Sequence, residues 1–136
     1  MAIEALRTPG AADLMALNGK WFTFWAVGAR LFIAGVMQSL RPQFTAQSIF
    51  DIKDQGALAI VREIGFGNLA MGALGLASLI RPEWVVPAAI AGGLYYGLGG
   101  LGHLFRPGRN FKEQTALVSD LAIFVLLAVF VTSRAV

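Results

Sequence analysis

The chain has 136 residues, of which 57% are hydrophobic and 14% are charged, and its mean hydropathy is +0.66. Soluble domains carry about 25% charged residues, so this composition indicates an integral membrane protein. The net charge of +3 and the lack of cysteine exclude a basic nucleic-acid-binding stripe and any thiol or Cys-ligated iron–sulfur chemistry.

A short helix is predicted at residues 9–18, ahead of the first long apolar block. Thr8 is a suitable N-cap and Pro9 a suitable first helical residue, while Asn18 and Gly19 suit a helix end. Leucine and methionine give this helix one apolar side. We therefore expect it to lie on the membrane surface.

Four apolar blocks follow, each long enough to cross a hydrocarbon core of about 30 Å at a rise of about 1.5 Å per residue. They predict an all-α, single-domain integral membrane four-helix bundle over residues 1–136, with both termini on one side. Because a short connection joins the second and third blocks, these two spans are expected to be antiparallel neighbours. The predicted spans are residues 21–40, 57–80, 84–105 and 116–133.

Three of the spans are followed by an arginine and a proline. The pairs are Arg41-Pro42, Arg81-Pro82 and Arg106-Pro107. Proline disfavours helical geometry in the residue before it, so each pair predicts a helix end whose arginine reaches the lipid head groups. The residues from 42 to 56 are expected to form a loop outside the hydrocarbon core.

Glycines on the second and third spans predict close helix packing. At about 100° per residue, the second span carries two small or polar stripes, and the third carries a GxxxG pair that is extended by one more glycine. Small residues allow backbones to approach each other in lipid, so we expect these two spans to pack closely. The packing glycines are Gly65, Gly67, Gly72, Gly75, Gly93, Gly97 and Gly100.

Polar residues inside the spans form the candidate site. With alternating spans, Glu63, His103 and Asp120 lie toward the end opposite the termini, and Arg30 can extend toward them. Charges in a membrane cost about 2.5 to 3.5 kcal/mol each. They indicate either a binding or proton-handling site or an ion-paired lock that fixes helix register. We favour a lock in which Arg30 pairs with Glu63 or Asp120. The full cluster is Arg30, Arg62, Glu63, Asn68, His103 and Asp120.

A groove is predicted along the glycine stripe of the third span, where a lipid, a quinone or another helix can fit. Its residues are Gly92, Tyr96, Gly99 and His103. A single histidine without cysteine is short of ligands for a metal ion. We therefore predict no metal and no tightly bound cofactor, and leave lipid and quinone open.

The order of these features resembles DoxX-like proteins and related uncharacterised families of small bacterial four-helix membrane proteins. The resemblance rests on glycine and arginine spacing in RLFIAG at 30–35, REIGFGNLAMGALGLASL at 62–79 and GLYYGLGGLGHLFR at 93–106. It implies an accessory subunit of the bacterial inner membrane, associated in some members with oxidoreductases. It carries over no catalytic residue.

Three functions remain open from the sequence. The first is a non-enzymatic accessory or scaffold protein that packs through its glycine faces, either with itself or with other membrane-protein subunits. The second is a small proton-coupled or ion-coupled carrier that uses Arg30, Glu63 and Asp120. The third is a subunit of a membrane oxidoreductase that binds quinone or lipid. Membrane lipids are expected partners in every case.

Overall fold

The computed structural model describes residue 4, residues 10–48 and residues 52–135. This part of the chain is helical and contains no strand, which confirms the predicted all-α class. The elements are α2 (Ala11–Thr23), the π-helix η1 (Phe24–Ala29), α3 (Arg30–Leu40), α4 (Pro42–Ser48), α5 (Gly56–Ala77), the 3₁₀ helix η2 (Pro82–Trp84), α6 (Val85–Phe105) and α7 (Phe111–Ala135).

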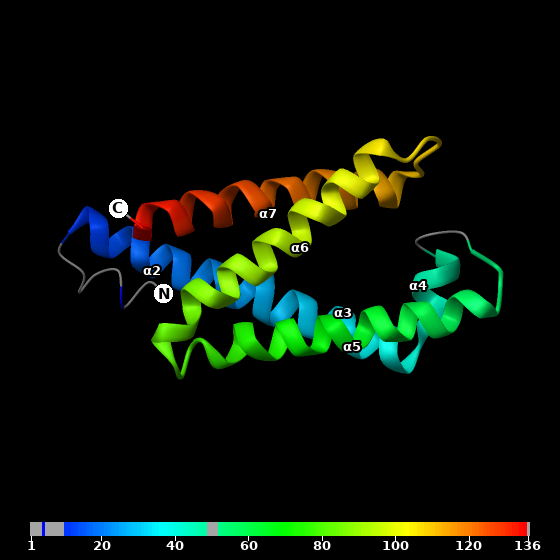
Figure 1. The fold of residues 1–136 in the computed structure, drawn as a ribbon, viewed down its shortest axis with the longest axis horizontal. Coiled ribbons are helices and arrows are strands. Elements are labelled where there is room, and N and C mark those ends of the chain that lie inside the picture. Colours follow the sequence, from blue (N-terminus) through cyan, green and yellow to red (C-terminus); the bar gives the residue numbers. More distant parts are fainter. Residues whose placement is uncertain (1–3, 5–9, 49–51, 136) are drawn as a thin grey trace.

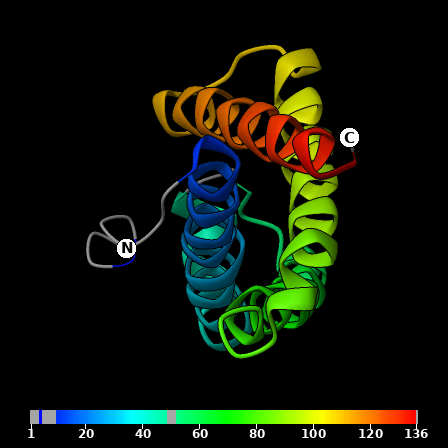
Figure 2. The ribbon, with the colours of Figure 1, turned by 90° about the vertical axis from the view of Figure 1, so that its left-hand side faces the viewer.

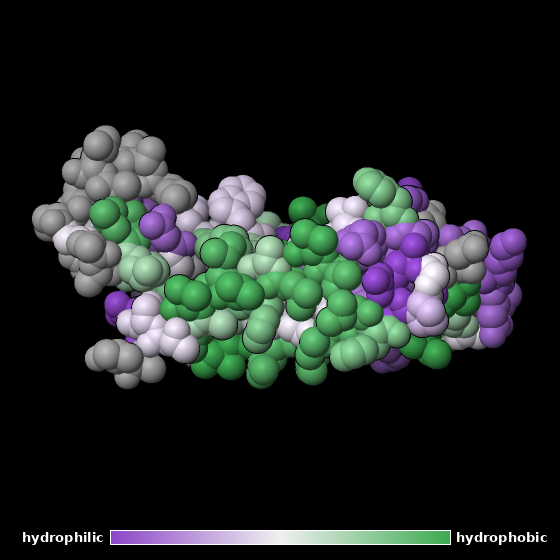
Figure 3. Space-filling model, turned by 90° about the horizontal axis from the view of Figure 1, so that it is seen from above, coloured by the Kyte–Doolittle hydropathy of each residue, from purple (hydrophilic) through white to green (hydrophobic). Residues whose placement is uncertain are grey.

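Four helical stretches among the described residues are long and apolar enough to cross a membrane, as predicted. Their apolar character matches the surface in Figure 3, where hydrophobic residues cover the middle of the face and hydrophilic residues gather toward one end. The length and hydropathy of these helices are thus compatible with an integral membrane protein. The stretches are Leu14–Leu40, Gly56–Ala77, Pro82–Phe105 and Phe111–Arg134.

The first span is one continuous helical path, because α2, η1 and α3 follow one another without a break. The prediction of a separate helix that ends at Asn18 and Gly19 is therefore wrong. Gly19 serves close packing instead: a Cβ atom at this position would overlap the Phe130 ring of α7. A surface position for the first turns stays a prediction.

Two of the three Arg-Pro pairs directly follow a helix, as predicted, because α3 ends at Leu40 and α6 at Phe105. The third pair comes later, since α5 ends at Ala77 and a turn precedes Arg81. Two of the prolines also begin the next helix. Arg41 follows α3 with non-helical dihedral angles, and Pro42 is the first residue of α4. In the same way, Pro82 begins η2. Proline suits a first helical position because a backbone N–H there would have no acceptor within the helix, so its loss costs nothing. The prediction of a loop from residue 42 onward is thus wrong as far as Ser48.

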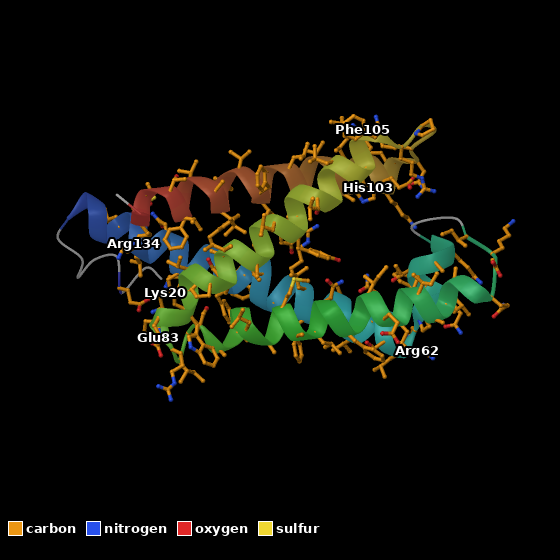
Figure 4. All side chains as sticks on the ribbon, viewed as in Figure 1. Lys20, Arg62, Glu83, His103, Phe105 and Arg134 are labelled. Carbon is orange, nitrogen blue, oxygen red and sulfur yellow. The ribbon has the colours of Figure 1, made fainter. Side chains whose placement is uncertain are left out.

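The helices form two pairs, α3 with α5 and α6 with α7. The pairs lie close together at one end and diverge toward the other, where α4 lies (Figure 1). Lys20, Glu83 and Arg134 occupy the first end (Figure 4). Figure 2 shows α6 and the first span along opposite sides of the molecule, with α7 above and α5 below.

The α5 glycines pack on the first span, not on α6. A Cβ atom at Gly75 would lie 2.6 Å from the Gly28 Cα atom, and one at Gly72 would lie 2.7 Å from the Phe32 Cα atom. A Cβ atom at Gly65 would lie 2.9 Å from the Ser39 backbone nitrogen, near the end of α3. Gly67 has no atom within 4 Å of such a Cβ atom, so its predicted role in packing within the chain is wrong.

Gly93, Gly97 and Gly100 of α6 pack on α7. A Cβ atom at Gly97 would lie 2.8 Å from the Phe124 ring, and one at Gly100 would lie 2.6 Å from the Leu121 side chain. Gly93 faces Leu127 at an ordinary contact distance. The predicted glycine contact between the second and third spans is therefore wrong. Glycine spacing shows that a helix face is lined by small residues, but it does not show which helix packs against that face.

Candidate functional site

Arg30 joins the first span to the α6–α7 pair. Its Nη2 atom donates hydrogen bonds to Asp120 Oδ1 at 2.9 Å and to Ser119 Oγ at 3.1 Å. Its guanidinium carbon lies 5.0 Å from the centroid of the Tyr96 ring, within the range of a cation–π interaction. The side chain is 42% exposed. Of the two predicted partners for Arg30, the structure brings Asp120 to it.

The π-helix η1 comes directly before Arg30 and is held by Tyr96. The Tyr96 hydroxyl donates to the Ala26 carbonyl at 2.6 Å, and the side chain is 2% exposed. A π-helix bonds each carbonyl to an amide five residues later and is common at functional sites. Tyr96 thus contacts both the π-helix and the cation that follows it.

A cavity of about 410 Å³ lies between α3, α4 and α5 on one side and α6 and α7 on the other. Polar side chains from both helix pairs line it, and Asp120 belongs both to the cavity and to the pair with Arg30. Figure 4 shows His103 near the end of α6 where the two pairs are apart. The lining residues are Gln38, Thr45, Val61, Ile64, Tyr95, Leu98, Gly99, Gly102, His103, Arg106 and Asp120.

The remaining members of the predicted polar cluster separate into two groups. Asn68 is buried and donates through Nδ2 to Gln38 Oε1 at 2.7 Å, so it supports the cavity wall. Arg62 donates instead to the Ser39 carbonyl at 3.3 Å and lies on the outer side of α5 (Figure 4). Glu63 is exposed and has no hydrogen bond or ion pair with any described residue. It therefore lies outside the site.

The predicted groove on α6 is only partly open. At Gly92 the Val27 side chain fills the space, with its Cγ1 atom 2.8 Å from the place of a Cβ atom. Tyr96 is buried in the core. Gly99 and His103 line the cavity described above. The prediction of an open groove is thus wrong at Gly92 and Tyr96, because the first span packs against this part of α6.

The corner between α6 and α7 holds the His103 end of the cavity in place. The Asn110 side chain accepts from the Glu113 amide at 2.9 Å, and Glu113 Oε2 accepts from the Asn110 amide at 3.0 Å. This is a capping box at the start of α7. Glu113 also pairs with Arg106 at 2.9 Å. Arg109 donates to the His103 carbonyl at 2.8 Å and so satisfies the end of α6.

Sequence reasoning missed this corner and part of the cavity wall. The signal for the corner was present, because Asn110 and Glu113 have the spacing of a capping box. No sequence signal singled out Gln38 or Thr45, which reach the cavity through the pairing of α3 with α5 and the position of α4. Tyr95 lines the cavity as well, and the sequence did not single it out.

Comparison with known proteins gives this chain a family. No curated protein and no solved structure matches it. A family model described as a family of unknown function, DUF6790, matches residues 1–135. The match covers all four apolar stretches, the Arg30–Asp120 pair and every residue that lines the cavity. The chain therefore belongs to the DUF6790 family, to which no function has been assigned.

Proposed function

We propose that this protein binds a membrane-soluble amphiphile, a lipid or a quinone, in the cavity between its two helix pairs, and that it acts in the bacterial inner membrane. The observation that carries the proposal is a cavity of about 410 Å³ whose mainly apolar lining includes a few polar side chains. Small-molecule sites measure about 300 to 1,000 Å³ and combine an apolar lining with a few convergent polar groups. The cavity has this size and composition.

The cost of polar groups in lipid supports a binding role. Polar groups are costly in an apolar medium unless they are hydrogen-bonded, so polar side chains at a cavity among apolar helices favour a ligand that can itself form hydrogen bonds. Val61, Ile64 and Leu98 offer contacts for hydrocarbon, while Tyr95 and His103 offer polar contacts for a head group. An amphiphile matches both kinds of surface.

Within this proposal the Arg30–Asp120 pair is structural. Arg30 ties α3 to α7 at the edge of the cavity through two hydrogen bonds and to α6 through the Tyr96 ring. The cation and the carboxylate neutralise each other, so the pair fixes how the two helix pairs sit without needing a ligand. We propose binding and positioning for this site, and no catalytic step.

Native mass spectrometry after gentle extraction tests the proposal with a matched pair of glycine variants. Gly102 lines the cavity and Gly67 lies on the outer face of α5, and a Cβ atom at either position has no neighbour within 4 Å. Gly102→Leu is expected to fill the cavity and lose the co-purified amphiphile, while Gly67→Leu keeps it. Equal ligand occupancy in the wild type and both variants would overturn the proposal.

A second candidate function, a scaffold that associates with a second copy of the chain, is favoured by one observation. Glu63, Gly67 and Ala70 lie one turn apart on the exposed face of α5, and this small surface allows close helix approach in lipid. The same spectra test it. A dimer in the wild type that Gly67→Leu abolishes supports the scaffold, whereas monomers throughout count against it.

A further inference from the structure

We infer that the cavity takes an uncharged amphiphile whose head group carries hydrogen-bond-accepting carbonyl oxygens. Two sources share this chemistry: the ester carbonyls of a neutral glycerolipid and the ring carbonyls of a quinone. The inference rests on the proposed function, because it names the ligand class of the same cavity. Two observations carry it, namely the balance of charges at the cavity and the unused N–H donors of two side chains there.

The carboxylate and the guanidinium that line the cavity already have partners of opposite charge. Asp120 pairs with Arg30 at 2.9 Å, and Arg106 pairs with Glu113 at 2.9 Å. An added ion in such a site has no counter-charge of its own, and an uncompensated charge away from water is costly. An uncharged head group leaves both pairs intact.

Two side chains in or beside the cavity carry N–H donors that have no acceptor among the described residues. Gln38 lines the cavity, and its Oε1 atom accepts from Asn68. Its amide nitrogen therefore carries two N–H groups, and no described residue accepts a hydrogen bond from them.

Arg30 is the second of these side chains and lies beside the cavity. A guanidinium has five N–H donors, and in the described part of the chain only Nη2 of Arg30 is used. Its side chain is 42% exposed, so the remaining N–H groups can reach a ligand that contacts Asp120. Carbonyl oxygens accept without donating, which makes them the partner that these two side chains lack.

The experiment compares four defined lipids on the full-length wild type in detergent by isothermal titration calorimetry. Dioleoylglycerol and decylubiquinone carry carbonyls and no charge, the dialkylglycerol ether lacks the carbonyls, and phosphatidylglycerol adds a negative charge. We expect one or both carbonyl probes to bind about tenfold more tightly than the ether, a difference of about 1.4 kcal/mol that lies within the range of one hydrogen bond. Binding of dioleoylglycerol alone identifies the glycerolipid, and binding of decylubiquinone alone identifies the quinone.

A matched pair of variants locates the donor. Gln38→Glu keeps an oxygen for Asn68 but removes both N–H donors, so we expect it to weaken carbonyl binding about tenfold. Gln43→Glu makes the same change on the exposed side of α4, outside the cavity lining, and should leave binding unchanged. Equal weakening by both variants counts against the inference.

Two results overturn the ligand class, and they can be told apart from failure of the proposed function. The class is wrong if the ether binds as tightly as dioleoylglycerol and decylubiquinone, or if phosphatidylglycerol binds more tightly than either. If Gly102→Leu abolishes the binding of the ether or of phosphatidylglycerol, the wild-type cavity does bind an amphiphile. The proposed function then stands, although the ligand class is wrong. If Gly102→Leu changes the binding of none of the four probes, the proposed function falls together with the inference.

Discussion

The two helix pairs use glycine in different ways. Between the first span and α5, glycines meet backbone atoms: a Cβ atom at Gly75 or Gly72 would collide with the Cα atom of Gly28 or Phe32. Between α6 and α7, they lie under the side chains of Phe124 and Leu121. A side chain can change rotamer at modest cost, whereas two packed backbones can only separate. The same small-residue motif therefore predicts different tolerance in the two pairs.

The comparison also bears on the cavity. The α3–α5 pair is fixed by backbone contact along most of its length, so it offers a rigid wall that carries Gln38. The α6–α7 pair is joined partly by rings and branched side chains and carries Tyr95, His103 and Asp120. If either wall adapts to a ligand, we expect it to be the α6–α7 wall.

The largest effect is expected for Gly75→Ala. Its methyl group would overlap the Gly28 backbone, and the two helices must move apart, so we expect a loss of about 3 kcal/mol in the free energy of unfolding. Chemical unfolding in mixed micelles measures this loss. Gly67→Ala is the control, because a methyl group there meets no atom within 4 Å. A stable Gly75→Ala protein would remove the distinction between the two pairs.

A smaller loss is expected when the link between the pairs is cut. Asp120→Asn leaves Arg30 without its carboxylate. Breaking a fully buried ion pair costs about 3 to 5 kcal/mol, and the 42% exposure of the Arg30 side chain reduces the expected loss to about 2 kcal/mol. The double variant Arg30→Met with Asp120→Leu should recover much of it.

Glu63→Gln provides the control for that experiment. Glu63 has no ion pair with any residue in the described ranges, so its neutralisation should leave the unfolding curve unchanged. Destabilisation by Glu63→Gln that equals the effect of Asp120→Asn would show that Arg30 has a different partner in the membrane.

Gly97→Ala should cost less than Gly75→Ala. Its methyl group would lie 2.8 Å from the Phe124 ring, but that ring is 38% exposed and has room to rotate. We expect a loss of about 1 kcal/mol, at the low end for overpacking. The same unfolding assay checks it, and a loss equal to that of Gly75→Ala would mean that the α6–α7 contact is no more adaptable than the other.

The smallest effect is a pH dependence outside the spans. Hydrogen bonds from Lys20 and Trp21 to Glu4 lower the pKa of this carboxyl below its ordinary value of 4.5. Because its folded-state pKa is depressed, its contribution to stability is present above pH 4.5 and is lost as the pH falls through the lower value. Glu4→Gln should therefore melt slightly below the wild type at pH 7, and the difference should shrink as the pH falls below 4.5.

The sequence was most informative where local chemistry decides the structure. The apolar blocks predicted four long helices, and two of the three Arg-Pro pairs predicted where helices end. The sequence was less informative where the structure depends on which helix packs against a given residue. Gly75 and Gly97 carry the same signal on neighbouring spans, yet they contact different helices. Glu63 and Asp120 are both carboxylates near the same end of the protein, but only helix rotation decides that Asp120 meets Arg30.

The cavity was the hardest feature to predict. Its wall combines residues from five helices, and α4 had been predicted as a loop. The sequence pointed to His103, Gly99 and Asp120 but could not place Gln38 opposite them, because that depends on how α3 packs on α5. The resemblance to DoxX-like proteins stays a prediction, since the DUF6790 match carries no function that could test it.

The π-helix Phe24–Ala29 has a consequence for how this chain tolerates insertions and deletions. Five-residue bonding accommodates one more residue than an α-helix needs over the same path. Deleting a single residue between Phe24 and Ala29 would therefore restore a regular α-helix and leave the flanking turns in register, so that Arg30 still faces Asp120 and Gly35 still packs on α5. In a regular α-helix the same deletion would turn everything after it by about 100°. The π-helix is thus the turn at which the first span is expected to tolerate the loss of one residue.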